Sequence, residues 1–72
     1  MTPEQFKMAK AALGLSNPEL AEMTGLHRNT LNKLDKGEGK DSTSKLVQLT
    51  LEAAGIEFIP ENGGGPGVRL KK

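Results

Sequence analysis

Hydrophobic residues recur every three or four positions through most of this chain, in short runs separated by glycines. This spacing places the apolar side chains of each run on one face of a helix. The runs predict four short helices, over about residues 2–13, 16–23, 28–36 and 41–54. Isolated helices of this length are marginal in water, so we expect them to pack on one another around a shared core.

Capping residues support these helix boundaries. Thr2 with Gln5, and Ser16 with Glu19, have the spacing of capping boxes, in which each side chain bonds the backbone N–H of the other residue. Residues 41–44 offer several caps for the fourth helix. We expect the buried stripe of that helix to contain Leu46, Leu49 or Thr50, and Ala53.

After Gly55 the pattern changes to a rough alternation of apolar and polar residues. Residues 56–59 and 68–70 are expected to form two strands around a connection rich in glycine and proline, which indicates a hairpin. A disordered tail is the alternative, although the apolar content argues against it. An ordered hairpin would pack on the helices or join its counterpart in a second chain. The residues that we expect to form a dimer interface are Ile56, Phe58, Ile59, Val68 and Leu70.

The composition narrows the class of protein. The chain has 72 residues, no cysteine and a single histidine, so we expect one domain with no disulfide, metal or other cofactor. Carboxylates are scattered along the helices, and we expect no enzyme. Glu4 lies near the start and no long apolar run follows, so we expect no signal peptide, no membrane contact and a cytoplasmic location. The net charge of +1 supports nucleic-acid binding only weakly.

Residues 17–36 form a unit of two short helices joined by a turn at Gly25. The small side chain of Ala21 lets the two helices cross closely. Apolar residues of both helices form the inner surface, among them Leu20, Leu31 and Leu34. The outward face of the second helix is polar and cationic, and it contains Arg28, Asn29, Thr30, Asn32, Lys33 and Lys36.

The stretch from Leu15 to Gly37 resembles the helix-turn-helix of the Cro/C1-type (xenobiotic-response-element) family. In that family a Ser or Thr cap, a small Ala, a turn Gly and an apolar pair before a closing Gly keep a fixed spacing. The matching residues are Ser16, Ala21, Gly25, Leu31, Leu34 and Gly37. Thr24 departs from the family pattern, because a large apolar residue is usual at this position.

With its flanking helices, the resemblance covers about residues 3–55. It implies a mainly α fold, a lambda-repressor-like bundle of four short helices followed by a pair of β-strands. We therefore expect a DNA-binding domain over residues 1–55 and a dimerisation extension over residues 56–72.

The resemblance also implies that the helix after His27 enters the major groove of DNA, led by its first residues. Arg28 and Asn29 fall where the family contacts bases; arginine can pair with guanine and asparagine with adenine. Asn17 begins a helix, where backbone N–H groups favour a phosphate. The full set expected to contact DNA is Asn17, His27, Arg28, Asn29, Thr30, Asn32, Lys33, Lys36 and Lys40.

Together these features indicate a transcriptional regulator that binds double-stranded DNA. We expect a repressor that binds a pseudo-palindromic operator as a homodimer. The alternative is the antitoxin of a toxin–antitoxin pair, or another interaction module, whose apolar tail holds a small protein partner.

Overall fold

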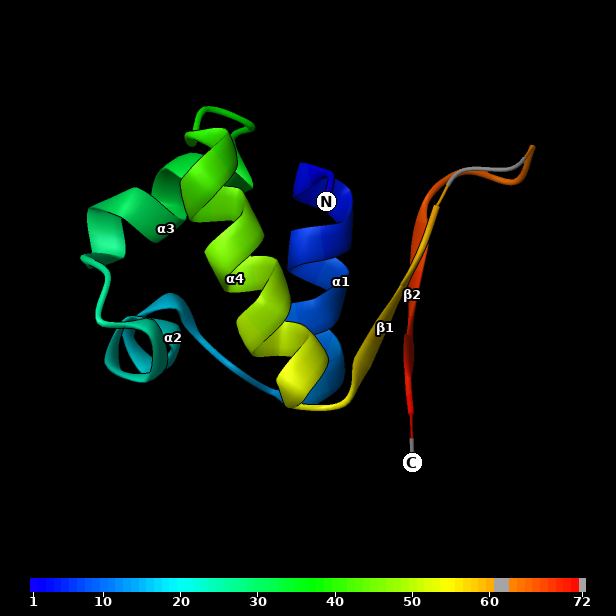
Figure 1. Cartoon of the computed structure of the whole chain (residues 1–72), viewed down its shortest axis with the longest axis horizontal. Helices are drawn as coiled ribbons and strands as arrows, with labels where there is room; N and C mark the ends of the chain where they lie inside the picture. The colour runs from blue at the N-terminus through cyan, green and yellow to red at the C-terminus, as the bar shows by residue number, and fades with distance from the viewer. Residues whose placement is uncertain (61–62, 72) are drawn as a thin grey trace.

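The computed structural model of this chain describes residues 1–60 and 63–71. Within these residues, four helices are followed by two strands (Figure 1): α1 (Pro3–Leu13), α2 (Asn17–Thr24), α3 (Arg28–Asp35), α4 (Asp41–Ala53), β1 (Ile56–Ile59) and β2 (Gly67–Leu70). The expected fold class, a mainly helical bundle with a C-terminal strand pair, is confirmed. In the described part of the chain no helix has both the length and the apolar character needed to cross a membrane.

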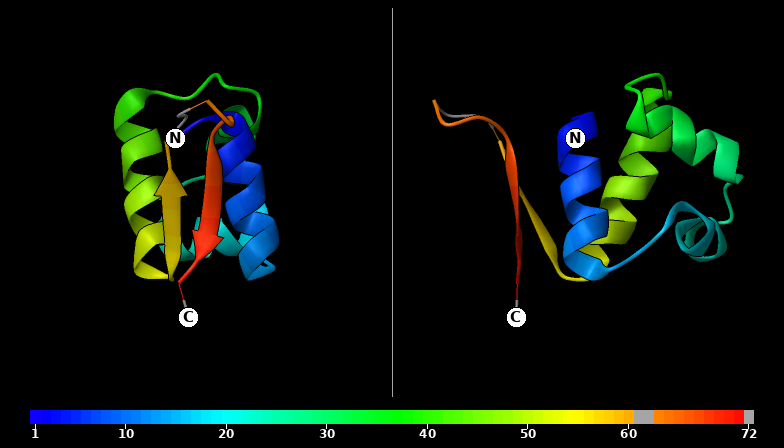
Figure 2. Two further views of the ribbon diagram at one scale, coloured as in Figure 1. Left: turned by 90° about the vertical axis from the view of Figure 1, so that its right-hand side faces the viewer. Right: turned by 180° about the vertical axis from the view of Figure 1, so that it is seen from behind.

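The elements lie in layers. Helices α2 and α3 form one end of the molecule, α1 and α4 stand side by side in the middle, and the hairpin covers the opposite end (Figure 1). Figure 2 shows that β1 runs along α4 and β2 along α1, and residue contacts link the same pairs. The hairpin therefore closes the side of the bundle that lies away from α2 and α3.

Capping explains where the first two helices begin. Thr2 caps α1: its Oγ1 accepts from the Gln5 N–H at 3.1 Å, and the Gln5 Oε1 accepts from the Thr2 N–H at 2.9 Å. Ser16 and Glu19 make the same reciprocal pair at the start of α2. Both predicted capping boxes are confirmed. Helix α4 instead has Lys40 at its cap position, and a lysine side chain offers no acceptor for capping.

The capping box of α2 makes the stability of the fold depend on pH. Hydrogen bonds from the backbone N–H and the hydroxyl of Ser16 lower the pKa of Glu19 below its usual value of 4.5. A carboxylate with a depressed pKa stabilises the fold above the unfolded-state pKa, and this contribution is lost as the pH falls through the folded-state pKa. Glutamine also completes a capping box. We therefore expect Glu19→Gln to lose less thermal stability than the unmodified chain between neutral pH and about pH 3.

Thermal unfolding followed by circular dichroism at both pH values measures this difference. Glu22→Gln is the matched control, since Glu22 lies on the same helix beyond the box. An equal acid-induced loss in Glu19→Gln and in the unmodified chain would show that the ionised box does not matter.

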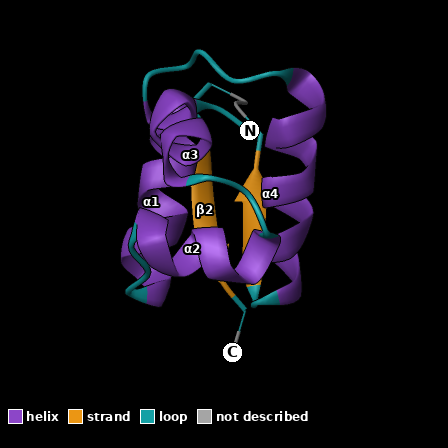
Figure 3. Cartoon of the chain, turned by 90° about the vertical axis from the view of Figure 1, so that its left-hand side faces the viewer, coloured by secondary structure: helices purple, strands orange, loops and turns teal. Residues whose placement is uncertain are grey.

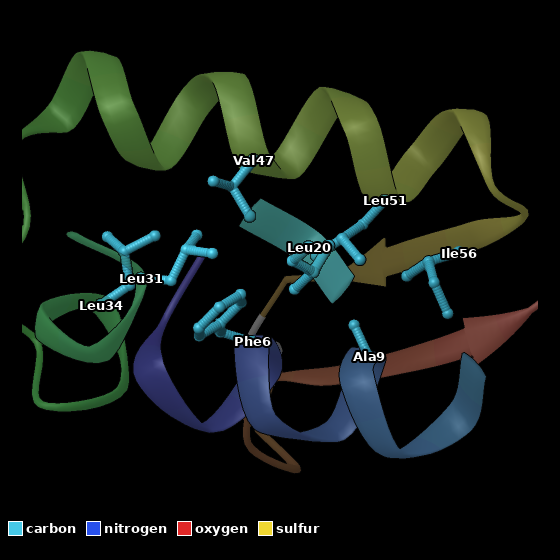
Figure 4. Close-up of a cluster of buried hydrophobic side chains, with 8 residues drawn as sticks. All are labelled: Phe6, Ala9, Leu20, Leu31, Leu34, Val47, Leu51 and Ile56. Carbon is cyan, nitrogen blue, oxygen red and sulfur yellow. The ribbon is translucent and has the colours of Figure 1, made fainter. Parts of the chain in front are cut away.

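The core lies where the three layers meet. Its side chains come from all four helices and from β1, and they point into the space between α1 and α4 (Figure 4). Among the described residues these are Phe6, Ala9, Leu20, Leu31, Leu34, Val47, Leu51 and Ile56. Because every element except β2 supplies at least one of them, the helices and the hairpin share a single core.

The buried stripe of α4 differs from the one expected. Val47 and Leu51 are buried, whereas Leu46 is 43% exposed, Leu49 is 52% exposed and Ala53 is also exposed. The expectation that Leu46, Leu49 and Ala53 line the core was wrong. Each helical residue turns by about 100°, so a residue two positions from Val47 and Leu51 points about 200° away from them. The helix has apolar residues on two faces, and the core takes only one of these faces.

The hairpin is an antiparallel pair in which Ile56 faces Leu70 and Phe58 faces Val68. These four side chains share one face, because strand residues alternate in direction. On this face Ile56 is only 1% exposed, and Phe58 and Val68 pack against the core. The opposite face carries Ile59 and an ion pair between Arg69 and Glu57.

The expectation that the hairpin packs on the helices is confirmed. Of the residues expected to form a dimer interface, Ile56 belongs to the core and is not available to a partner. Dimerisation through the other four, Phe58, Ile59, Val68 and Leu70, stays a prediction.

Gln5 joins α1 to both strands. Its side chain is almost fully buried, and its Nε2 donates to the carbonyl oxygens of Ile59, at 2.9 Å, and Gly67, at 3.0 Å. Ile59 and Gly67 form the last pair of the ladder before the connection between the strands. One amide therefore completes the capping box of α1 and holds the loop end of the hairpin against the helix.

Candidate nucleic-acid interface

Helices α2 and α3 form a compact pair at one end of the molecule (Figure 3). Gly25 makes the turn between them with a φ of 76°, a left-handed conformation that glycine adopts at low cost. Thr24 strengthens this turn, because its Oγ1 donates to the carbonyl of Leu20 at 2.7 Å and accepts from the N–H of Leu26 at 3.2 Å. At the position that departs from the family pattern, a hydroxyl therefore supplies two local hydrogen bonds.

Helix α3 has one buried face and one exposed polar face. Leu31 and Leu34 are buried, whereas Asn29, Lys33 and Lys36 are exposed. The last three are spaced four and three residues apart, so they form one stripe on the side of α3 that faces away from the core. This stripe carries two positive charges and one amide. Of the other residues expected to contact DNA, His27, Arg28, Asn32 and Lys40 are exposed as well.

The first turn of α3 is shaped by His27. Its Nδ1 accepts a hydrogen bond from the N–H of Asn29 at 3.1 Å, which makes His27 the helix cap. A ring nitrogen that accepts in this way leaves the proton of the neutral imidazole on Nε2. Arg28 and Asn29 follow directly and are both exposed. Two side chains able to pair with bases thus lie at the positive end of the helix dipole.

A hydrogen-bond network holds α3 against the start of α2. The Asn17 Nδ2 donates to the Asn32 Oδ1 at 2.6 Å and to the Asp35 Oδ2 at 3.0 Å. The Asn17 Oδ1 accepts from the Lys10 Nζ at 2.8 Å. Two residues of the expected DNA-contacting set, Asn17 and Asn32, therefore contact each other. Their amides fix the position of α3 before any ligand arrives.

The same network extends to α1 through an ion pair that the sequence did not reveal. The Lys10 Nζ lies 2.8 Å from the Asp35 Oδ1, and these side chains are only 14% and 24% exposed. The ammonium group also lies 4.3 Å from the centre of the Phe6 ring, a cation–π distance. Twenty-five residues separate Lys10 from Asp35, so no helical or strand periodicity links them.

Lys33 and Lys40 line one cleft between α3 and the start of α4. The cleft has a volume of about 340 Å³, and its lining is Leu26, Thr30, Lys33, Glu38, Gly39, Lys40 and Thr43. Three residues of the expected set, Thr30, Lys33 and Lys40, are thus brought together. Two ammonium groups and two hydroxyls suit a phosphate group, and the carboxylate of Glu38 opposes it. Lys36 lies outside this cleft, at the end of α3.

The arrangement combines an exposed polar stripe on α3 with a network that holds the helix in place. Within residues 1–60 and 63–71, histidine and carboxylate side chains do not gather in groups of three that would hold a metal ion. Comparison with protein-family models found no match, and comparison with curated proteins found none either. The geometry of α3 and its supports is therefore the basis for assigning a function.

Proposed function

We propose that this chain binds double-stranded DNA in a sequence-specific manner, with α3 as the recognition helix in the major groove. The exposed stripe of Asn29, Lys33 and Lys36 on a helix fixed by its neighbours carries this proposal. A recognition helix needs side chains that reach base edges and a support that keeps them in register. The Asn17–Asn32–Asp35 network supplies that support.

The roles of the site residues follow from their positions. Arg28 and Asn29, exposed on the first turn, read base edges, since arginine can pair with guanine and asparagine with adenine. Lys33 and Lys40 contact the sugar–phosphate backbone from the two sides of their cleft. His27 keeps its Nε2–H for a phosphate while its Nδ1 caps the helix. Lys36, at the end of the stripe, contacts the phosphate backbone, and Thr30 and the backbone at Asn17 add contacts at the margins.

The proposal includes assembly into a homodimer on a pseudo-palindromic operator, where the protein acts as a transcriptional repressor. The net charge of +1 gives one copy little general attraction to DNA. Two copies double the number of base contacts. Their recognition helices would enter successive major grooves about 34–36 Å apart.

Selection of binding sites from random duplexes tests the proposal directly. We expect an enriched sequence with two related half-sites, bound at least about a thousandfold more tightly than random DNA at physiological salt. A folded sample that binds every duplex with the same affinity would overturn the proposal.

Two substitutions separate base reading from phosphate contact. Arg28→Ala is expected to cost about 1–3 kcal/mol of operator affinity and to relax the preference at one base pair. Lys40→Ala is expected to weaken all sequences alike and to lower the salt dependence of binding by about one ion. Binding titrations on the selected site and on its single-base variants measure both effects. An unchanged base preference in Arg28→Ala would contradict the role given to Arg28.

A further inference from the structure

The outer side of α4 carries an apolar surface that nothing in the chain covers among the described residues. Leu46, Leu49 and Ala53 are exposed and are spaced three and four residues apart, so they lie along one side of the helix. We call these three residues the α4 outer stripe. Single exposed leucines are common on protein surfaces, but aligned ones on neighbouring turns are typical of a helix that packs against a partner.

We propose that the α4 outer stripe binds the same stripe of a second copy of this chain, with the two α4 helices antiparallel around a two-fold axis. We place the two-fold axis at the level between Gln48 and Leu49, which sets the register of the two helices. Leu46 of one copy then lies opposite the midpoint between Leu49 and Ala53 of the other. Each leucine enters a gap on the facing helix, as ridges pack into grooves.

Charge complementarity supports this occupant and this direction. Lys45 and Glu52 are both exposed and are seven residues apart, which places them on the same flank of the stripe, two turns from each other. A two-fold axis perpendicular to both helices keeps this flank on the same side in both copies. The axis between residues 48 and 49 then brings Lys45 of each copy opposite Glu52 of the other. A parallel pairing would put this flank on opposite sides of the seam in the two copies, so Lys45 and Glu52 would not meet.

The position of α4 in the fold agrees with the proposed pairing. In Figures 1 and 3, α4 stands between the α2–α3 end and the hairpin end, and its outer side faces away from α1. The two-fold axis is perpendicular to the plane of the two paired α4 helices. It therefore runs in the direction from the hairpin end to the α2–α3 end. Both copies consequently present α3 at the same end of the dimer. A single duplex can therefore meet both recognition helices.

The hairpin offers a poorer surface for a second copy. Its apolar face already packs on the helices through Ile56, Phe58 and Val68. Its outer face carries the ion pair of Glu57 and Arg69 beside Ile59. The α4 outer stripe, in contrast, has two leucines about half exposed and needs no rearrangement of the core to receive a partner.

This surface would form the homodimer of the proposed function, on which the inference rests. Dimerisation of the chain is nevertheless measured in the absence of DNA. Failure of the dimer and failure of DNA binding are thus separate results. Sedimentation equilibrium of the full chain at micromolar concentration should show a dimer. Leu49→Lys should be a monomer with unchanged helical circular dichroism, whereas the control Met8→Lys, an exposed apolar residue of α1, should remain a dimer. A monomeric unmodified chain, or a dimeric Leu49→Lys, would overturn the proposal.

Charge exchange tests the antiparallel register. Lys45→Glu and Glu52→Lys each place like charges opposite one another twice in the dimer, and each should weaken dimerisation by about tenfold. The double variant restores opposite charges and should recover the original dissociation constant. A double variant no better than the two single variants would exclude this register.

Cross-linking provides an independent readout. The chain has no cysteine, so Leu49→Cys introduces the single thiol, and this thiol lies beside the two-fold axis. A short bis-maleimide reagent should join two copies of Leu49→Cys and should leave Met8→Cys, on α1, uncoupled. Equal yields from the two variants would show random collision and would count against the α4 interface.

Discussion

Replacement of Gln5 by glutamate is expected to lower the free energy of unfolding by about 2–4 kcal/mol at neutral pH. Glutamate at this position still completes the capping box with Thr2, so the start of α1 is preserved. The buried amide that donates to the carbonyls of Ile59 and Gly67 is replaced by a carboxylate that has no donor. Three acceptor groups would then face one another in a site that water reaches poorly.

Urea unfolding followed by circular dichroism measures the loss. Thr2→Ala is the control for the cap alone and should cost about 1 kcal/mol. Acidification should reduce the defect of Gln5→Glu, because the protonated acid regains one donor for a strand carbonyl. A change no larger than that of Thr2→Ala would show that the contact of Gln5 with the hairpin contributes little.

Asp35→Ala is the second change with a large expected effect. It removes the acceptor that both the ammonium of Lys10 and the amide of Asn17 use. Because Lys10 is largely buried, its charge would lose its partner without gaining full hydration, and we expect a cost of about 2–3 kcal/mol. We also expect weaker binding to the selected site and a smaller preference for it over random DNA, since α3 loses its attachment to α1 and α2 and no longer holds Arg28 and Asn29 in register.

A double-mutant cycle separates the pair from its surroundings. Lys10→Met removes the charge and keeps an unbranched side chain of similar length, so the combined variant should be more stable than Asp35→Ala. Glu38→Ala, a neighbouring exposed carboxylate, is the control and should change stability by less than about 0.5 kcal/mol. Additive effects of Lys10→Met and Asp35→Ala would exclude coupling between the two side chains.

Local signals in the sequence were sufficient to predict the helices and the residues at which they begin and end. Two capping boxes, a turn glycine and a change of period after Gly55 correspond to boundaries in the structure. These features depend on residues no more than four positions apart. The outward face of α3 was likewise readable, because Leu31 and Leu34 fix which side of the helix is buried.

Contacts between segments far apart in the sequence could not be predicted from local patterns. Helix α4 has two apolar faces, and only the packing of its neighbours decides that Val47 and Leu51 enter the core. The Lys10–Asp35 pair and the contact of Gln5 with both strands join residues far apart in the sequence. Gly39, only five positions after Leu34, is a different case: a Cβ there would overlap the buried side chain of Leu34, so the connection from α3 to α4 favours glycine.

The contact between Gln5 and the hairpin has a consequence for synthesis in the cell. The amide of Gln5 is made among the first residues of this sequence, but one of its acceptors, the carbonyl of Gly67, is made 62 residues later. Ile56, which fills the core from β1, also follows all four helices. On the ribosome, the emerging helices would therefore lack Ile56 and the two strand acceptors of Gln5 until the hairpin has left the exit tunnel. A fragment of this chain that ends at Gly55 should therefore remain sensitive to protease.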